Sequence, residues 1–199
     1  MDRGAPGGRI AGLVPAAGAS RRLGQDKRRL PCGESTVLEA TVASLRDGGL
    51  ERVVLVLEPD SPCVGLPGLA AVERVVNPRP ERGMLSSVRE GLRALSDSVL
   101  GVAVLPGDHP FVPASVVATL VARFLEAEPD LLAPRYGLRR GHPLFVHQRL
   151  FAEAMACDDA VGLRELVWRH EARLLAVPIE APGAEDDLDL PEHLARLRR

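Results

Sequence analysis

Small residues and three cations are grouped in one segment near the start of the chain. The run from Pro15 to Lys27 reads Pro-Ala-Ala-Gly-Ala-Ser-Arg-Arg-Leu-Gly-Gln-Asp-Lys. Small residues let a backbone approach a ligand closely, and glycine adopts conformations that turn several N–H groups toward an anion. Arg22 and Lys27 would then neutralise a triphosphate, the arginine as a fork and the lysine as a point charge. The run matches neither the P-loop nor the dinucleotide-binding pattern, so a basic surface loop is an equally good interpretation of its composition.

Carboxylates occur at two places that could hold a divalent cation. Asp108 lies in the segment Leu-Pro-Gly-Asp-His-Pro over residues 105–110, directly after an apolar run. Mg²⁺ takes one or two carboxylates together with phosphate oxygens and water, so a carboxylate at a strand end suits it. Asp187 and Asp189 would face the same side of an extended segment and could complete that site. The alternatives are an aspartate that stabilises its own turn and an acidic helix start.

Alternating strands and helices must position these loops. Continuous apolar runs predict buried strands, and apolar residues at helical spacing predict the helices between them. This alternation implies βαβ crossovers and an α/β fold with a mostly parallel, doubly wound sheet, in which ligands bind beyond the C-terminal ends of the strands. The loops after Ala16 and Leu105 both leave such ends. We expect strands at 10–16, 52–57, 72–76, 99–105, 130–133, 143–146 and 174–179, and helices at 36–45, 84–95, 113–126, 150–155, 161–168 and from Pro191 onward.

Length and composition fit one globular domain. The 199 residues are 46% apolar and 26% charged, which is ordinary for a folded protein. A net charge of −2 and an aromatic content of 3% argue against nucleic-acid binding. Three dispersed cysteines without a C-x-x-C pair exclude a disulfide framework and a thiolate-rich zinc site, and suit a reducing cytosol. With no secretory signal and no membrane-spanning stretch, we expect a cytoplasmic protein with a flexible tail over residues 1–8 and a single domain over 9–199.

The first loop resembles the A-A-G-x-S-x-R-M-G-x-x-K motif of the molybdopterin-type (MobA-like) NTP transferases, and among them most closely the molybdenum cofactor cytidylyltransferases. In that family the loop wraps the triphosphate. Leu23 stands where the family has methionine. Related guanylyltransferases read A-G-G at residues 16–18, so alanine at position 17 favours CTP over GTP. The resemblance implies catalytic roles for Arg22, Lys27 and Asp108, and nucleotide binding by Ala16, Ala17, Gly18, Ala19, Ser20 and Gly24.

Two further segments resemble motifs of the same family near the nucleotide and its metal. Residues 107–110 resemble G-D-x-P, which implies that Asp108 binds Mg²⁺. Residues 187–193 resemble D-[IV]-D-T-P-E-D and imply that Asp187 and Asp189 are ligands, although Leu190 replaces the threonine that would cap the last helix.

A third segment precedes both of these in the chain. The run over residues 77–88 resembles N-P…G-[ML]-x-[TS]-S-V, which implies that Gly83 and Ser87 lie near the nucleobase. Gly83 would offer backbone approach, and Ser87 a hydroxyl that both donates and accepts hydrogen bonds. A helix start with serine as its cap is an equally good interpretation of this segment.

The acceptor side is implied by a fourth motif. Residues 139–143 resemble G-[RI]-x-G-H-P, which implies that Arg139, Arg140, Gly141 and His142 contact the terminal phosphate of a phosphorylated pterin. Trp168 and Tyr136 are predicted to be packing residues.

The resemblance covers residues 10 to about 194 and implies a Rossmann-like nucleotidyltransferase fold. It implies Mg²⁺-dependent transfer of CMP from CTP to molybdopterin or the molybdenum cofactor, with release of pyrophosphate. The alternatives are a guanylyltransferase, a transferase acting on methylerythritol phosphate or a sugar phosphate, and a non-catalytic chaperone that carries a nucleotide-containing cofactor. The expected partners are CTP, the phosphorylated pterin and, transiently, a client molybdoenzyme or its chaperone, without nucleic acid or membrane.

Overall fold

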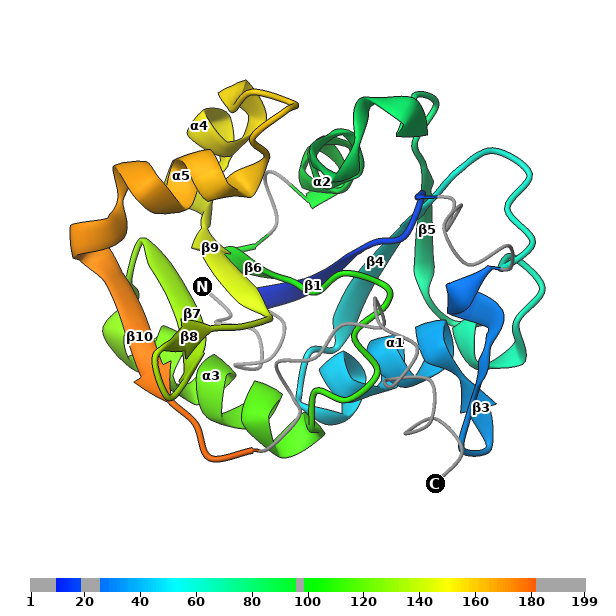
Figure 1. The fold of residues 1–199 in the computed structure, drawn as a ribbon, viewed down its shortest axis with the longest axis horizontal. Helices are drawn as coiled ribbons and strands as arrows, with labels where there is room; N and C mark the ends of the chain where they lie inside the picture. Colours follow the sequence, from blue (N-terminus) through cyan, green and yellow to red (C-terminus); the bar gives the residue numbers. More distant parts are fainter. Residues whose placement is uncertain (1–9, 19–25, 96–98, 182–199) are drawn as a thin grey trace, which may run out of the picture.

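The computed structural model describes residues 10–18, 26–95 and 99–181. Over these ranges a single large sheet runs through the molecule, with helices on both of its faces (Figure 1). The predicted tail over residues 1–8 and the predicted helix from Pro191 lie outside the described residues. The expected α/β fold is confirmed.

The sheet has the strand order β10-β7-β9-β6-β1-β4-β5, and β8 pairs with β7. Four neighbours, β6, β1, β4 and β5, run parallel, and β7 runs parallel to β10. Between these groups β9 runs antiparallel to both β6 and β7. The strands are β1 (Ile10–Pro15), β4 (Arg52–Leu57), β5 (Glu73–Val76), β6 (Gly101–Val104), β7 (Leu131–Tyr136), β8 (Arg139–Arg140), β9 (Leu144–His147) and β10 (Leu174–Pro178), with a separate hairpin of β2 (Pro31–Cys32) and β3 (Ser35–Thr36).

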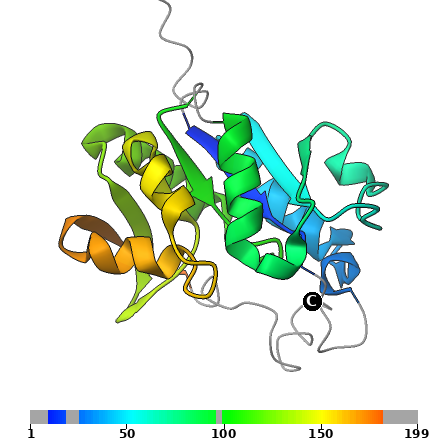
Figure 2. The same ribbon diagram turned by 90° about the horizontal axis from the view of Figure 1, so that it is seen from above.

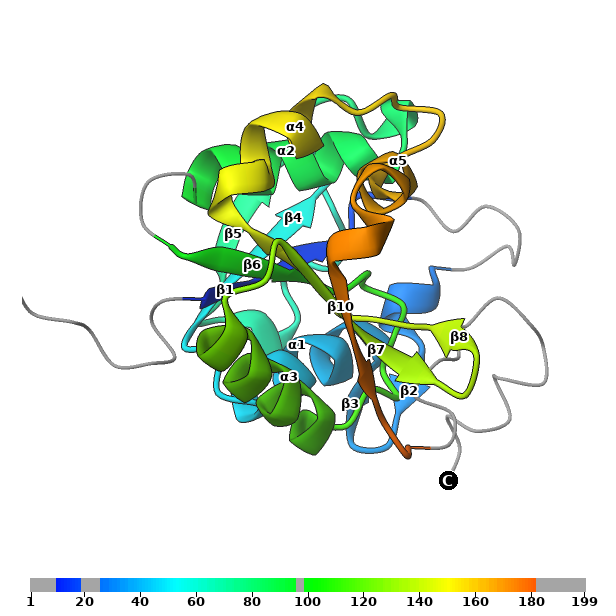
Figure 3. The ribbon, with the colours of Figure 1, turned by 90° about the vertical axis from the view of Figure 1, so that its left-hand side faces the viewer.

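The helices form two layers. In Figures 1 and 3, α1 and α3 lie on one face of the sheet and α2, α4 and α5 on the other. Seen from above, α2 covers one half of the sheet, and α4 and α5 cover the other (Figure 2). No α-helix in the described ranges combines the length and apolar character needed to cross a bilayer. The bounds are α1 (Val37–Asp47), α2 (Met84–Leu95), α3 (Ala114–Ala127), α4 (Phe151–Ala156) and α5 (Leu163–Arg169).

The central strand β1 supplies both hydrophobic cores, because successive side chains of a strand point to opposite faces. Ile10 and Val14 are fully buried in the core beneath α1 and α3. Ala11 and Leu13 are fully buried in the core beneath α2 and α4. A strand buried on both faces explains why residues 10–15 are an almost continuous apolar run.

Local hydrogen bonding explains where α1 begins, and the start of α3 differs from the prediction by one residue. Thr36 and Glu39 form a capping box at the start of α1, in which each side chain accepts from the other residue's backbone N–H. Pro113 was predicted in the first turn of α3 but is its N-cap, with extended backbone, so the helix begins one residue later. Proline suits this place because it needs no backbone donor there.

Candidate active site

The nucleotide loop and the Asp108 loop meet at the C-terminal ends of β1 and β6. The backbone N–H of Gly107 donates to the carbonyl of Pro15 at 3.2 Å, and that of Ala16 donates to Val56 at 2.9 Å. A Cβ atom on Gly107 would lie only 2.8 Å from the Cβ of Ala16. Glycine at position 107 therefore allows the two loops to pack directly on one another.

Lys27 is carried by a single 3₁₀ turn, η3 (Lys27–Arg29), whose first backbone groups are capped by Asp26. The next residue, Arg28, is 6% exposed and donates to the carboxylates of Asp26 and Glu58 at 2.7 and 2.6 Å. Its guanidinium also donates to the carbonyl of Ala16. Because Glu58 follows β4 and Ala16 follows β1, Arg28 anchors the Lys27 turn to the ends of two strands.

Sequence reasoning did not identify Arg28, Asp26 and Glu58, because nothing in the local pattern pairs residues 28 and 58. Burial by itself would raise the pKa of both carboxyl groups, but the hydrogen bonds and charge of Arg28 outweigh it and lower both values. Both carboxylates are therefore ionised at neutral pH. Their partner Arg28 stays protonated, and the three groups form a closed charged cluster that contacts Ala16 through Arg28.

Asp108 lies at this junction with an ionised carboxylate. Its Oδ1 is 3.0 Å from Nδ1 of His109. Burial alone would raise the pKa of Asp108, but the hydrogen bond and charge of His109, its own backbone N–H and the charge of Lys27 together lower it. Lys27, itself 6% exposed, therefore lies close enough for its charge to act on Asp108.

These residues fit a magnesium ion. Mg²⁺ commonly takes one or two carboxylates and fills its remaining positions with phosphate oxygens and water. Asp108 supplies one such carboxylate, ionised and at a strand end. Within residues 10–18, 26–95 and 99–181 no group of three or more His, Cys, Asp or Glu residues could hold a metal by itself, so the remaining ligands would come from phosphate, water and residues outside these ranges. The remaining predicted residues of this part of the site lie outside the described residues: Ala19, Ser20, Arg22, Gly24, Asp187 and Asp189.

On the predicted nucleobase side, Gly83 and Ser87 flank the start of α2. Gly83 is exposed and has a φ of +86°, a conformation that favours glycine. Ser87 is 2% exposed, and its hydroxyl accepts a hydrogen bond from Nδ2 of the buried Asn77 at 3.0 Å. The same amide donates to Ser86 at 2.7 Å. Ser87 thus joins β5 to α2 through Asn77, and its predicted contact with a base stays a prediction.

The acceptor segment reaches the Asp108 loop through two histidines. The rings of His109 and His142 meet edge to face, with centroids 4.8 Å apart. Burial, reinforced by the charge of His109, lowers the pKa of His142 to about 4. The imidazole is therefore neutral at pH 7 and cannot supply a positive charge to a phosphate. Arg139 and Arg140 are exposed on β8, and Arg140 forms an ion pair with Glu171.

The two aromatic residues differ in their surroundings. Tyr136 is 8% exposed, and a Cβ atom on Gly141 would lie 2.6 Å from its ring, so the packing prediction is confirmed for this residue. The same prediction for Trp168 is wrong, because its side chain is 63% exposed. In α5 the fully buried side chain is that of Leu166, and Trp168 lies on a different side of this short helix.

A cavity of about 730 Å³ opens beside His142, between the start of α2, the β8 hairpin and α5. Its volume is within the range of small-molecule sites. The residues around it include Met84, Val104, Leu138, Arg140, His142 and Trp168.

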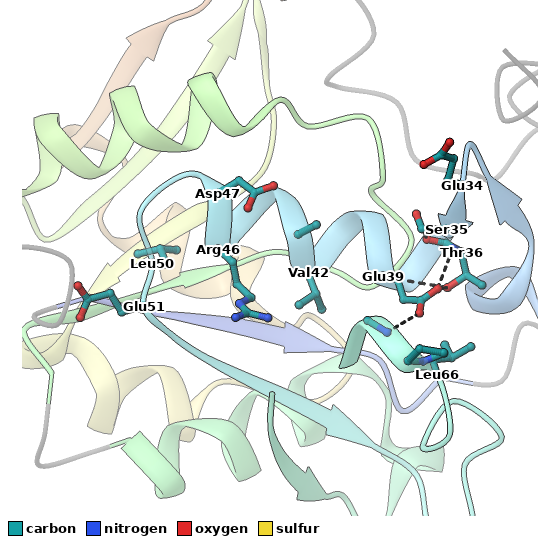
Figure 4. Close-up of a pocket in the computed structure, with 13 residues that line it drawn as sticks. Glu34, Ser35, Thr36, Glu39, Val42, Arg46, Asp47, Leu50, Glu51 and Leu66 are labelled. Carbon is teal, nitrogen blue, oxygen red and sulfur yellow. Dashed lines mark hydrogen bonds between the residues drawn. The ribbon is translucent and has the colours of Figure 1, made fainter. Parts of the chain in front are cut away.

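A larger hollow of about 940 Å³ lies on α1, away from this chemistry. Figure 4 shows that Glu39 there points toward Thr36 and toward the backbone of the 3₁₀ turn η4 (Pro67–Leu69). Its carboxylate accepts from Thr36 and from Gly68 at 2.9 and 2.8 Å, so it ties α1 to that turn. None of the predicted site residues lines this hollow, and we assign it a structural role.

Comparison with known proteins identifies close relatives. The family model of the MobA-like NTP transferase domain matches residues 12–174. A probable molybdenum cofactor guanylyltransferase of Opitutus terrae is 35% identical over 107 residues, 53% of this chain and 51% of that protein, so the match spans about half of that relative. A molybdenum cofactor guanylyltransferase of Rhizobium johnstonii is 28% identical over 184 residues, 88% of this chain and 82% of that protein.

Solved structures agree with this assignment. The crystal structure of Rv0371c from Mycobacterium tuberculosis H37Rv has a TM-score of 0.84 at 27% identity, covering 95% of this chain and 96% of that one. A structure of Rv0371c in complex with manganese has the same fold, with a TM-score of 0.77 at 23% identity over 95% and 97% of the two chains. The sheet, the loops at its C-terminal edge and the family match together place this chain in the MobA-like NTP transferase domain family of nucleotidyltransferases.

Proposed function

We propose that this protein transfers CMP from CTP to a phosphorylated pterin, with Mg²⁺ as cofactor and pyrophosphate as the second product. The observation that carries the proposal is the packing of two loops at one edge of the sheet: Gly107, next to Asp108, donates to Pro15, and Arg28, next to Lys27, donates to Ala16. A buried cation beside an ionised metal carboxylate, on a loop of small residues, is suited to a triphosphate with its divalent ion.

The reaction forms one bond and breaks one. An oxygen of the acceptor's terminal phosphate bonds to the α-phosphorus of CTP, and the bond from that phosphorus to the bridging oxygen of the β-phosphate breaks. Pyrophosphate leaves with the bridging oxygen and its electron pair. Because the attacking phosphate is already ionised, no general base is required, and positioning with charge neutralisation supplies most of the acceleration.

Each residue then has a defined task. Lys27, together with Arg22, neutralises the charge that develops on pyrophosphate. Asp108 would hold Mg²⁺, with Asp187 or Asp189 as a second carboxylate, and His109 orients Asp108 through the bond to Oδ1. Magnesium, when bound, neutralises charge on the α-phosphate and the pyrophosphate. Arg139 and Arg140 attract the acceptor phosphate, while neutral His142 contributes a hydrogen bond only.

The choice of base rests on position 17. Alanine there resembles the cytidylyltransferases, and its side chain is buried. The named relatives are guanylyltransferases, which makes GTP the donor to test against CTP. Greater turnover with GTP would overturn the base assignment and leave nucleotidyl transfer intact.

The test is pyrophosphate release measured with CTP, GTP, ATP and UTP against a phosphorylated pterin, methylerythritol phosphate and glucose 1-phosphate. We expect release with CTP and the pterin. Asp108→Asn should lower turnover at least ~100-fold, the scale of losing a main electrostatic stabiliser. Asp47→Asn, an exposed aspartate on α1, is the matched control and should be unaffected. Near-normal turnover of a folded Asp108→Asn variant would remove Asp108 from the site.

A further inference from the structure

Three exposed apolar side chains surround one cavity. Met84, Leu138 and Trp168 are 56%, 96% and 63% exposed. All three line the cavity of about 730 Å³ beside His142, although they come from the start of α2, the turn between β7 and β8, and α5. Large apolar side chains scattered singly on a surface need no explanation, but their convergence from three elements on one cavity indicates a ligand surface.

The polar side chains that line the same cavity are two arginines, one histidine and the carboxylates of Asp159 and Glu171, of which Glu171 forms an ion pair with Arg140. Arg140 and Arg164 line it from β8 and α5, and Arg164 has no ion pair with another described residue. An apolar wall with Arg164 beside it suits a flat heteroaromatic body with a phosphate attached.

We propose that the indole of Trp168 forms a stacking platform for the planar ring system of the acceptor, with Met84 and Leu138 as neighbouring apolar contacts. This inference rests on the proposed function and assigns a residue that selects its acceptor. Methylerythritol phosphate and sugar phosphates have no π face and would gain little from an indole, whereas a pterin offers one. Trp168 is thus a specificity residue for the acceptor and has no part in the phosphate chemistry.

Tryptophan fluorescence tests the proposal directly, because Trp168 is the single tryptophan of the chain. Titration with 6-hydroxymethylpterin phosphate should quench its fluorescence saturably, after correction for absorption with free N-acetyltryptophanamide. Methylerythritol phosphate and glucose 1-phosphate should leave the emission unchanged. By calorimetry, Trp168→Leu should weaken pterin phosphate binding about 5- to 100-fold, the range for losing one base–aromatic stack.

Two variants serve as controls. Trp168→Phe keeps a smaller aromatic face and should retain most of the affinity. Val76→Ala removes an apolar side chain that is 58% exposed outside the cavity and should change nothing. Trp168 is largely exposed, so thermal unfolding of the leucine variant should match the wild type, and affinity for CTP with Mg²⁺ should be unaltered.

Equal pterin affinity of wild type and Trp168→Leu would overturn the proposal, as would preferred binding of methylerythritol phosphate. The outcomes separate the platform from the reaction. If pterin phosphate binds on Trp168 but no triphosphate yields pyrophosphate, the proposed transfer fails and the platform stands. If methylerythritol phosphate supports pyrophosphate release that Trp168→Leu does not alter, transfer stands and the platform is refuted.

Discussion

Replacing Arg28 by methionine should test whether the charged cluster of Arg28, Asp26 and Glu58 stabilises the fold and the predicted site. The Arg28 side chain is 7% exposed, and its partners Asp26 and Glu58 are 22% and 19% exposed. Methionine fills a similar volume but leaves two ionised carboxylates near one another without their cation. The carbonyl of Ala16 also loses its guanidinium donor.

The expected cost follows from that burial. Breaking a buried ion pair by removing one partner costs about 3–5 kcal/mol. Both carboxylates are about one-fifth exposed, so solvent screening favours the lower end of this range, about 3 kcal/mol. For a domain of this size each kcal/mol lowers Tm by about 2–4 °C, which gives a fall of about 6–12 °C.

The same substitution should weaken nucleotide binding. Arg28 anchors both Ala16 and the turn that carries Lys27. In the variant these two residues are no longer held in the positions that would contact a triphosphate. We expect affinity for CTP with Mg²⁺ to fall about tenfold, the scale of one lost charge-assisted hydrogen bond. Calorimetry at a temperature well below the lowered Tm separates this effect from unfolding.

Urea unfolding of four proteins gives the decisive measurement: wild type, Arg28→Met, Glu58→Met and the double variant. The double variant removes the charge pair and should recover part of the stability lost in Arg28→Met, because apolar residues in place of a buried pair are often tolerated. Additive losses, or a loss below about 1 kcal/mol in Arg28→Met, would refute the reasoning about this cluster.

The other predictions concern the junction of the two loops. Lys27→Met should raise the pKa of Asp108, because a nearby positive charge that lowers it is removed. A carboxyl NMR titration of the metal-free protein measures this pKa, and an unchanged value would show that Lys27 does not act on Asp108. Gly107→Ala should destabilise the fold by about 1–3 kcal/mol through overpacking and lower turnover, whereas Gly65→Ala, whose added Cβ meets nothing within 4 Å, should do neither. Folded His142 has a pKa lowered from 6.5 to about 4, so its contribution to stability is present above pH 6.5 and is lost as pH falls toward 4, and His142→Gln should flatten this part of the stability profile in urea titrations at successive pH values.

The strands and helices whose apolar residues follow a regular pattern were predicted from the sequence. The apolar runs at 52–57 and 99–105 correspond to β4 and β6, and the stripe at 84–95 corresponds to α2. The predicted strand at 130–133 extends further, to Tyr136. Neither β8 nor the β2–β3 hairpin was predicted, because two-residue strands have no measurable alternation. The antiparallel direction of β9 was also not predicted, although the short connection from β7 leaves no room for the crossover that a parallel pair needs.

For the candidate site, the chain by itself determined which residue types lie at strand ends: the small-residue loop with Lys27, and Asp108 after a buried strand. Local composition suffices for these, since each motif is contiguous. Only the tertiary structure decided that Arg28 pairs with Glu58, that His142 is buried and neutral, and that Trp168 is exposed beside the cavity near His142. These properties depend on which distant segments surround a side chain, and burial and charge environment are set by that packing and not by neighbours in sequence.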